Sequence, residues 1–387
     1  KQMKKTLVAL AVLGSFAGVA SAATSVTLYG TLDAGYEDWN FHKGLKDVGF
    51  NDQLVQGGTS EKNSKIGIKG QEDLGNGLAA IFTLEGGIGA DVGETNAGQL
   101  FNRESTVGLK GSFGEVKIGR AKSQMELALG GIVPGHRVAD VDLYSVAMTR
   151  HSNGLFYSYE NSGFSFGADV TTKSGAYGNK GGNVDVLGLG APAVTAGYAS
   201  EGAKGSKVGY GVRLGYAGQV GGGVTLLARA AYQDDGRVYA YDATGVAIDE
   251  AKQREAGGLL AAVVPFGNNN VTFGVAYAQG KGLASDLGDA KFGVGRIYAD
   301  KARTLSGVIA AGFGSNDSVY VKYQQRKGTV EGETVYKGNV WAAGYEHNLS
   351  KRTSVYADVA YATIKNHPAT TEKGNALGYS VGLAHNF

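Results

Sequence analysis

The chain of 387 residues contains no cysteine, only 4 prolines, and no excess of either charge. The absence of cysteine excludes disulfide scaffolds, thiolate zinc sites and cysteine nucleophiles. Lysine and arginine number 37 against 35 aspartate and glutamate residues, so the charge balance indicates no nucleic-acid partner. Glycine is frequent, at 64 residues, but collagen is excluded because proline is scarce and no G-X-Y period is present.

Long apolar runs are also missing, apart from one at the N-terminus. Lys4 and Lys5 precede an apolar segment, residues 6–19, which ends at the small-residue cleavage site Ala20-Ser21-Ala22. This segment is shorter than the ~20 residues that a transmembrane helix needs. Residues 1–22 are therefore expected to be a cleaved signal peptide, and residues 23–387 a single domain that is either soluble in the periplasm or crosses a membrane as strands.

Beyond residue 24 the sequence alternates with a period of two. Tyr210, Val212 and Leu214 share one face of a segment whose other face carries Gly211 and Arg213. This alternation is typical of β-strands. In an outer-membrane barrel the apolar face meets lipid, the polar face lines a wet lumen, and the sheet must close because lipid satisfies no open edge. The sequence therefore predicts an all-β, transmembrane, antiparallel up-and-down β-barrel.

The connections alternate between tight turns and longer loops, as in such barrels. Eight tight turns and nine longer loops give 18 strands, and one miscounted hairpin would leave 16. The tight turns are predicted at Glu72–Gly77, Ser112–Gly114, Glu160–Gly163, Gly190–Pro192, Gln219–Gly223, Pro265–Asn269, Gly314–Asp317 and Ser350–Thr353.

The end of the chain has the pattern of a final membrane strand. Phe387 is the last residue, and the alternate positions before it are His385, Leu383, Val381 and Tyr379. A final strand that ends in an aromatic residue resembles the assembly signal of outer-membrane barrels. We expect this strand to close the barrel against Val26–Tyr36.

Five segments resemble the general porins of beta-proteobacteria and Neisseria: Val26–Gly30, Ser64–Gly77, Ser105–Arg120, Asn348–Thr353 and the C-terminal VGLAHNF. The resemblance implies a homotrimer of 16-stranded barrels in the outer membrane of a Gram-negative bacterium, which passes ions and small hydrophilic solutes by passive diffusion. It also implies outer-membrane lipid, lipopolysaccharide and the barrel-assembly machinery as partners, and no cofactor. The count of 18 departs from the family, and segment 303–338 is interpreted as an extra hairpin.

Porins of this family fold their third long loop into the barrel, where it narrows the pore against a basic wall. The equivalent loop is 122–149, which offers Glu126, Asp140 and Asp142 but also Lys122, His136 and Arg137. The resemblance places the basic wall on Lys65, Arg103 and Arg150, and strand alternation adds Lys69 and Lys117.

Alternation supports inward positions for Lys65 and Arg150, but it conflicts with an inward Arg103. Arg103 shares its phase with Val107 and Leu109 on the lipid face. Either a β-bulge shifts the phase or Arg103 lies above the membrane.

Enzymatic and metal-binding roles find no support in the motifs. Two G-x-S-x-G strings, Gly163–Gly167 and Gly378–Gly382, lie on alternating strands and not on the strand-to-helix turn of a serine hydrolase. The 6 histidines lack zinc-binding spacing, so no catalytic residue or metal ligand is assigned, while a calcium site among the loop acids stays open. A diffusive porin is favoured over a sugar-specific channel, because the inward positions are mostly small or charged rather than aromatic.

Overall fold

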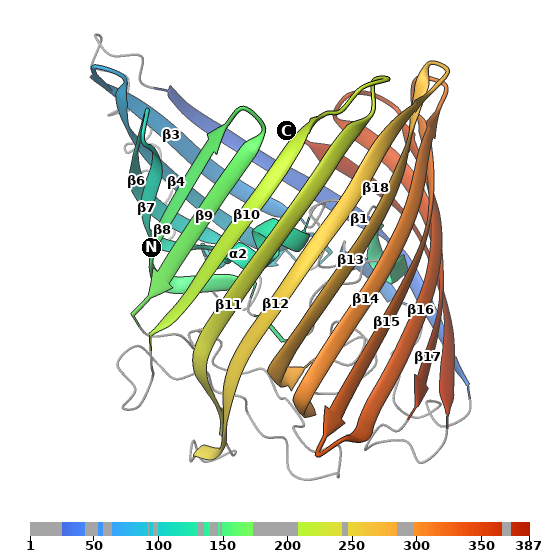
Figure 1. The fold of residues 1–387 in the computed structure, drawn as a ribbon. Helices are drawn as coiled ribbons and strands as arrows, with labels where there is room; N and C mark the ends of the chain where they lie inside the picture. The colour runs from blue at the N-terminus through green and yellow to red at the C-terminus, as the bar shows by residue number, and fades with distance from the viewer. Residues whose placement is uncertain are drawn as a thin grey trace, which may run out of the picture.

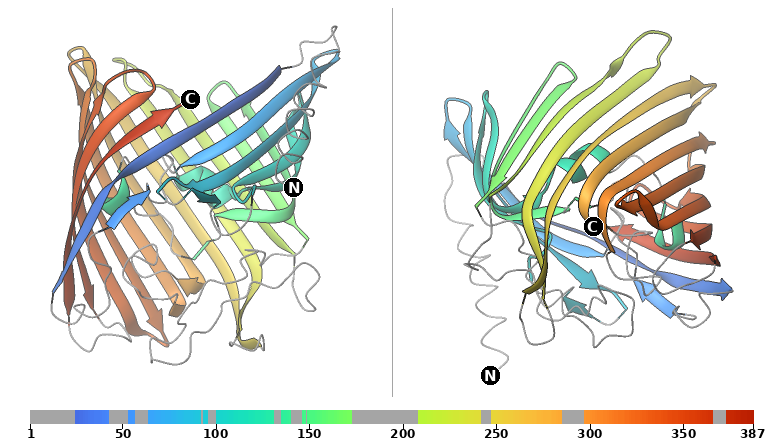
Figure 2. Two further views of the ribbon diagram at one scale, coloured as in Figure 1. Left: turned by 180° about the vertical axis from the view of Figure 1, so that it is seen from behind. Right: turned by 60° about the horizontal axis from the view of Figure 1, so that its bottom comes forward.

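The computed structural model describes residues 25–42, 53–56, 64–91, 93–95, 100–130, 135–139, 146–147, 149–172, 208–241, 247–284, 297–365 and 373–387. The predicted signal peptide, residues 1–22, lies outside them. The described chain is almost entirely antiparallel strand, and the strands run obliquely, one beside the next, around a curved wall (Figures 1 and 2). No helix in these ranges is long and apolar enough to cross a membrane.

The wall consists of long strands that pair in sequence order. They are β1 (Ser25–His42), β3 (Lys65–Gly75), β4 (Leu78–Gly89), β6 (Glu104–Gly111), β7 (Gly114–Lys122), β8 (Arg150–Asn161), β9 (Phe164–Thr171), β10 (Gly209–Gln219), β11 (Thr225–Tyr241), β12 (Ala247–Phe266), β13 (Asn269–Ala284), β14 (Ile297–Phe313), β15 (Asp317–Val330), β16 (Glu333–Asn348), β17 (Thr353–Lys365) and β18 (Gly374–Asn386).

Two short strands, β2 (Gln53–Gln56) and β5 (Glu94–Thr95), pair alongside β1 and β4. They do not separate neighbours in the wall, because β1 pairs directly with β3 and β4 pairs directly with β6. The sheet of 18 strands less these two gives a wall of 16 strands, the number that the family resemblance implies.

The first and last strands close the barrel, as predicted. Thr31–His42 of β1 pair with residues 386–375 of β18, while Ser25–Thr31 pair with β3. The main-chain N–H of Phe387 donates to Gly30 O at 3.1 Å, and the Gly30 N–H donates to Phe387 O at 3.2 Å. A Cβ on Gly30 would lie 2.3 Å from the Phe387 ring, so only glycine lets the terminal aromatic lie over β1.

The count of 18 wall strands and the extra hairpin at 303–338 are wrong. This segment forms regular parts of β14, β15 and β16, and the last two are joined by Glu331 and Gly332, both at positive φ as in a type I′ turn. The surplus hairpin came from the turn at Gly190–Pro192, which lies outside the described residues. Because β9 pairs directly with β10, the wall has no place for a hairpin between them.

Exposure alternates along the strands as the sequence predicts. In β10, Tyr210, Val212 and Leu214 are 44%, 42% and 64% exposed, whereas Gly211 and Arg213 are buried. The outward face therefore carries the apolar side chains that lipid requires. Exposed phenylalanines lie next to the short turns, at Phe113, Phe164, Phe266 and Phe313, and form an aromatic girdle at that end of the barrel.

The third long connection, between β7 and β8, folds into the barrel, as expected. Its described residues include the helix α2 (Gln124–Leu129) and the 3-10 turn η4 (Arg137–Ala139). α2 contacts β10, β11 and β12, and η4 contacts β16, β17 and β18 on the other side of the lumen. Figures 1 and 2 show α2 inside the ring of strands.

Deletion of Phe387 is expected to lower the fraction of chains that form the closed barrel, since it removes two hydrogen bonds and the ring contact over Gly30. The shift in gel mobility between unheated and heated samples measures this fraction. Phe313→Ala is the matched control, because Phe313 is also an outward aromatic residue but takes no part in the pairing of β1 with β18. Equal folded fractions for the two variants would contradict the assigned role of Phe387.

Candidate functional site

One end of loop 3, residues 122–149, is anchored to the wall by the apolar side of α2. Ser123 caps this helix, and its Oγ accepts a hydrogen bond from the Glu126 N–H at 3.3 Å. Met125 and Leu129 are fully buried and belong to one cluster with side chains from β11, β12 and β13, namely Ala231, Leu259, Ala276 and Ala278. The helix is therefore held by the same kind of burial that holds a soluble core.

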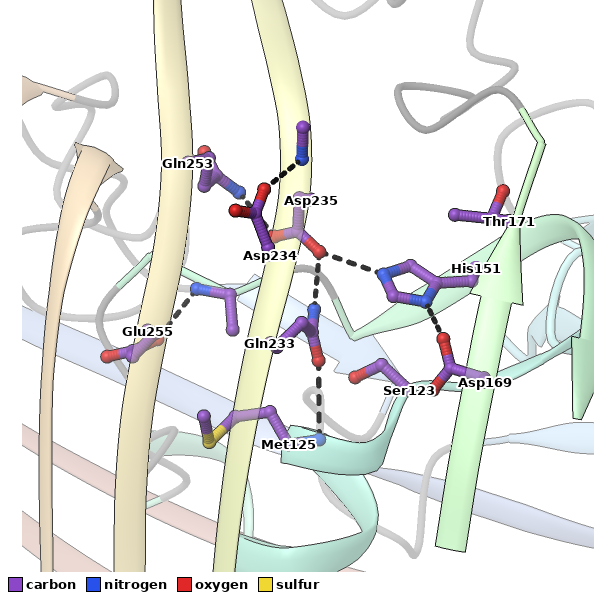
Figure 3. Close-up of polar contacts among 12 residues, drawn as sticks. Ser123, Met125, His151, Asp169, Thr171, Gln233, Asp234, Asp235, Gln253 and Glu255 are labelled. Carbon is purple, nitrogen blue, oxygen red and sulfur yellow. Dashed lines mark hydrogen bonds and ion pairs between the residues drawn. The ribbon is translucent and has the colours of Figure 1, made fainter. Parts of the chain in front are cut away.

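A buried polar cluster lies between α2 and the wall (Figure 3). His151 Nδ1 is 2.5 Å from Asp169 Oδ2, and its Nε2 is 2.8 Å from Asp235 Oδ1. Gln233 and Gln253 donate to Asp235, and Gln233 also accepts from the Met125 N–H at 3.3 Å. Both ring nitrogens donate at once only in the imidazolium, so this geometry fits a protonated His151 between two carboxylates.

The returning limb of loop 3 is held by a carboxylate on β12. Glu255 Oε2 accepts hydrogen bonds from the Val146 N–H at 3.0 Å and the Ala147 N–H at 2.7 Å. Hydrogen bonds to a buried carboxylate are stronger than neutral ones. This contact fixes the main chain of the loop and not only its side chains.

The middle of loop 3 is anchored to the opposite wall by Arg137. Its Nη2 is 3.2 Å from Asp33 Oδ1 on β1, and its Nε donates to the Tyr356 hydroxyl on β17 at 2.6 Å. The same hydroxyl donates to Asp33 Oδ1 at 2.6 Å. Arg137 is 1% exposed, so this ion pair is fully buried and its two partners depend on each other.

His136 reinforces the contact made by Arg137. Its ring stacks on Tyr356, with the centroids 3.8 Å apart and the planes 10° apart. Its Nδ1 is 3.4 Å from Asp358 and its Nε2 is 3.8 Å from Glu346. Val138 and Ala139 of η4 add apolar contacts in a cluster with Trp39, Tyr320, Val340 and Ala360. Loop 3 thus crosses the lumen between two fixed attachments.

Three of the predicted wall lysines occupy inward positions by strand register. Lys65 pairs with Thr31 and Lys69 with Thr27 on the inward face of β1, and Lys117 pairs with the buried Phe156. The Lys117 ammonium lies 3.0 Å from Glu104 and 3.2 Å from Glu115. The Lys69 ammonium lies 5.1 Å from the centre of the Tyr29 ring.

Arg103 contacts the inward carboxylate of Glu85, although the alternation of the sequence predicts an outward side chain for Arg103. β6 begins at Glu104, so Arg103 precedes the strand and does not follow its phase. Its Nε is 2.6 Å from Glu85 Oε1, and the Tyr29 hydroxyl donates to the other oxygen of Glu85 at 3.0 Å. Glu85 pairs with Gly67 on the same face as Lys65.

The alternation that predicts an inward Arg150 holds along most of β8 but does not hold at Arg150 itself. The pairing of β7 with β8 shifts register between Gly119 and Ala121, and beyond the shift it is His151 that pairs with the buried Ala121. Arg150 pairs with Lys122 instead, and its Nε donates to Arg103 O at 2.9 Å.

On the loop side of the predicted constriction, Glu126 lies 3.4 Å from Lys122. Asp140 and Asp142 lie outside the described residues. No group of three His, Cys, Asp or Glu side chains in the described part of the chain is placed to hold a metal ion.

Three inward cations on β10, β11 and β15 were not predicted as site residues from the sequence. Arg213 Nε donates to Gln124 Oε1 at 3.4 Å, and Arg229 Nη1 donates to Leu127 O at 3.5 Å. Lys322 is 4% exposed and lies close to Gly135 of loop 3. Alternation signals their inward phase, but it does not indicate that loop 3 lies against them.

Comparisons with known proteins agree with this geometry. The family model of Gram-negative porins matches residues 9–367. The chain is 31% identical over 410 residues to an outer membrane porin protein of Bordetella pertussis, with 100% of both chains covered. It is also 31% identical over 389 residues to outer membrane porin protein 32 of Delftia acidovorans, with 98% of this chain and 95% of the relative covered.

Among solved structures, the chain has the fold of an anion-selective porin from Comamonas acidovorans. The TM-score is 0.59 at 24% identity, and the match covers 94% of this chain and 100% of that one. At this identity the likeness shows the fold alone, whereas the family match and the two full-length relatives show the family. The chain belongs to the Gram-negative porin family and is an outer-membrane channel of a Gram-negative bacterium.

Proposed function

We propose that this channel is a general diffusion pore, whose passage is set by a constriction between loop 3 and the basic wall. The observation that supports this most directly is the double attachment of the loop. α2 packs on β10–β12, and Arg137 forms an ion pair with Asp33 across the lumen. A loop fixed at both sides narrows the pore permanently and does not close it.

We propose that the basic wall of this constriction consists of Lys65, Lys69, Arg103, Lys117 and Arg150, and that its acidic side consists of Glu126, Asp140 and Asp142 of the loop. Opposed charges across a narrow aqueous passage sort permeants by charge. Arg103 and Lys117 each have a carboxylate within 3.0 Å, which offsets part of their field. We therefore expect a weak preference for anions.

The position of the inward aromatic side chains supports a diffusion pore over a sugar-specific channel. Five inward rings are at most 7% exposed, and the half-buried ring of Tyr29 is held by its hydrogen bond to Glu85; the five are Trp39, Phe156, Tyr320, Tyr336 and Tyr356. A channel that guides sugars along aromatic rings needs those rings at the pore surface. Buried rings serve as packing surfaces instead, and Trp39 and Tyr320 belong to the cluster that holds η4.

We also propose a homotrimer, with contacts on the β6–β8 side. Ser105 and Arg120 pair across β6 and β7 in the same outward phase as Val107 and Ile118, which are 62% and 61% exposed. Arg120 is half-buried and donates to Asn102 O at 2.7 Å and to Ser152 Oγ at 2.6 Å, and an arginine in this outward phase is more favourable against protein than against lipid. An outer membrane protein of Vibrio cholerae with the same fold has been solved in a trimer form, at 14% identity and a TM-score of 0.60.

The outward face of the final strand, β18, offers a site for a further partner. We propose that the barrel-assembly machinery binds the final strand through Tyr379, Val381, Leu383, His385 and Phe387. The three apolar members of this series before Phe387 are 43–51% exposed on the outward face. Ions and small hydrophilic solutes are the proposed permeants.

The double variant Lys65→Glu, Lys69→Glu is expected to move the permeability ratio several-fold toward cations. It replaces two inward positive charges by negative ones, and a unit charge a few Å from a permeating ion contributes on the order of 1–4 kcal/mol before salt screening. The measurement is the reversal potential of single channels in a planar bilayer under a salt gradient.

The control for this experiment is Lys351→Glu, Arg352→Glu, which makes the same charge change in the exposed turn between β16 and β17. Its reversal potential should stay close to wild type. Equal shifts for both variants would show that Lys65 and Lys69 do not line the constriction. Current block by micromolar sugar in the same recordings would favour the sugar channel.

Arg137→Gln is expected to detach the middle of loop 3 and to raise single-channel conductance. It leaves the buried Asp33 carboxylate without its cation, which costs about 3–5 kcal/mol of stability. Adding Asp33→Asn should recover part of the loss, because it removes the unpaired charge. Lys122→Gln is the control, since its partly exposed pair with Glu126 contributes below about 1 kcal/mol. Unchanged conductance in Arg137→Gln would argue against a loop held by this pair.

Unheated protein is expected to run as an oligomer and to crosslink into three subunits in mild detergent. Ser105→Trp should shift the unheated band to the monomer, because it places a large ring in the proposed contact. Leu214→Trp, at an outward position of β10 that is 64% exposed, should leave the oligomer intact. A monomeric wild type would contradict the proposal.

A further inference from the structure

Two β-bulges interrupt the wall strands that hold the polar cluster around His151 (Figure 3). In β8, Ser152 and Asn153 together face the single residue Arg120 of β7, and Asn153 has a positive φ of 52°. Alternation from the inward Gly154 would place Ser152 inward and His151 outward. The extra residue reverses this phase, so His151 takes the inward position instead.

The second bulge, in β11, provides one of the two carboxylates that the imidazole contacts. In the pairing of β11 with β12 the register passes from Asp234 directly to Gly236, so Asp235 is the extra residue. Gly236 has a positive φ of 73°, and its N–H donates to the Asp234 carboxylate at 2.9 Å. A bulge redirects side chains at such a point. Here it brings the Asp235 carboxylate to 2.8 Å from His151 Nε2.

The intervening strand, β10, carries glycine at the level of the cluster. Gly211 pairs with Asp169 of β9 on one side and with Gln233 of β11 on the other. A Cβ on Gly211 would lie 2.9 Å from Asp169 Oδ1 and 3.2 Å from the side chain of Gln124 in α2. A larger residue would therefore displace either the Asp169 carboxylate or the helix, and its absence leaves room for the imidazole to bridge β9 and β11.

Asp235 connects His151 to the helix of loop 3 through a single amide. Gln233 Nε2 donates to Asp235 Oδ1 at 2.6 Å, and Gln233 Oε1 accepts from the Met125 N–H at 3.3 Å. A carboxylate only accepts hydrogen bonds, so Asp235 determines which end of the amide faces α2. Met125 lies in the first turn of α2, where N–H groups have no partner within the helix. The position of Asp235 therefore controls a hydrogen bond to the start of α2.

The cluster depends on the charge of His151, because one ring serves two carboxylates. Asp169 Oδ2 lies 2.5 Å from His151 Nδ1, and the other oxygen of Asp169, Oδ1, accepts no hydrogen bond. His151, Asp169 and Asp235 are at most 5% exposed, so water screens their charges little. A neutral ring has one N–H and can donate to only one carboxylate. Loss of the ring proton therefore leaves two buried carboxylates without their cation and one of them without the donor that the ring supplied.

The other elements around the cluster carry uncharged groups at this level, namely Ala121 on β7, Gly211 on β10, Gln253 on β12 and Gln124 on α2. The charged groups on these elements and on β8 and β11 bond elsewhere: Lys122 to Glu126, Arg150 to Arg103 O, Arg213 to Gln124, Asp234 to the Gly236 N–H, and Glu255 to the main chain at 146–147. The proton of His151 is therefore the one whose loss changes the contacts between its two carboxylates.

We propose that His151 is a positioning residue that controls the pore width through its proton. Its imidazolium holds Asp235 and, through Gln233, keeps the first turn of α2 against the wall. When the proton is lost, water enters to compensate the buried carboxylates, α2 loosens, and the pore widens on the side of β10–β12. This inference rests on the proposed constriction, because it assigns a control to the same loop.

The first test is His151→Gln, which removes the charge and leaves one donor. It should raise the single-channel conductance in a planar bilayer, and the difference from wild type should disappear at alkaline pH, where the wild-type ring is neutral too. His347→Gln is the matched control, because His347 also contacts a carboxylate, Asp317 at 2.8 Å, but lies on the outward face beside a short turn. Its conductance should equal wild type. Unchanged conductance in folded His151→Gln would overturn the proposal.

Removing the two carboxylates one at a time separates their roles. Asp169→Asn added to His151→Gln should restore wild-type conductance, because the two amides can bond to each other and Gln keeps its donor for Asp235. Asp235→Asn added to His151→Gln should not restore it, because Asn has one accepting oxygen where Asp235 accepts from both Gln233 and Gln253. Equal conductance of the two double variants would show that Asp235 is not the link to α2.

A second readout follows α2 itself. The chain has no cysteine, so Ala128→Cys introduces a single thiol at a fully buried position of the helix. A charged, water-soluble thiol reagent should modify it faster when His151→Gln is also present. Equal rates of modification would contradict a loosened helix.

If His151→Gln does not fold, Gln233→Leu breaks the same series of hydrogen bonds beside α2 and should raise both the conductance and the rate of modification. Arg137→Gln separates this inference from the proposed function. If Arg137→Gln raises the conductance but His151→Gln and Gln233→Leu do not, the constriction stands and the role of His151 is wrong. If none of the three changes the conductance, both proposals are wrong.

Discussion

Every main-chain hydrogen bond in the wall of this barrel has to be made within the sheet, because lipid offers neither donors nor acceptors. The joint between the two ends of the chain meets this requirement. β1 pairs with β3 over Ser25–Thr31 and with β18 over Thr31–His42, and the short β2 pairs with Ala34–Glu37. Phe387 and Gly30 exchange the last pair of bonds. Closure at this joint fixes the strand number, and the register of each strand pair fixes which side chains face the lumen.

A closed wall with 16 strands encloses more space than its own side chains fill, so the lumen is wet and loop 3 has to be attached to the wall by contacts of its own. Charged residues are therefore buried here beside the two apolar clusters that hold α2 and η4. Arg137 and Asp33 share the Tyr356 hydroxyl, and His151 lies between two carboxylates. The additional hydrogen bonds offset part of the cost of burying these charges, although Asp33 Oδ2 and Asp169 Oδ1 accept no hydrogen bond. Loop 3 is therefore attached through small networks and not through single ion pairs.

Period-two alternation was sufficient to predict the barrel, its outward face and seven of the tight turns, since these depend on local residue patterns. The strand number was not predictable in the same way, because Gly190–Pro192 has turn residues but β9 and β10 pair directly. Alternation did not predict the positions of Arg103 and Arg150 for a similar reason. Arg103 precedes its strand, and Arg150 lies beyond a register shift. The anchors at Arg137 and His151 join residues up to 219 positions apart, and no local pattern carries that information.

The cations of this chain fall into two groups with different dependence on their surroundings. Arg103, Lys117 and Arg137 face inward and lie within 3.2 Å of a carboxylate of the same chain, so their positions are set when the barrel folds. Arg303, Lys327, Lys337 and Lys365 lie in the outward phase of β14–β17 and form no ion pair among the described residues. The inward cations Arg103, Lys117 and Arg137 are compensated within the chain and hold a fixed geometry.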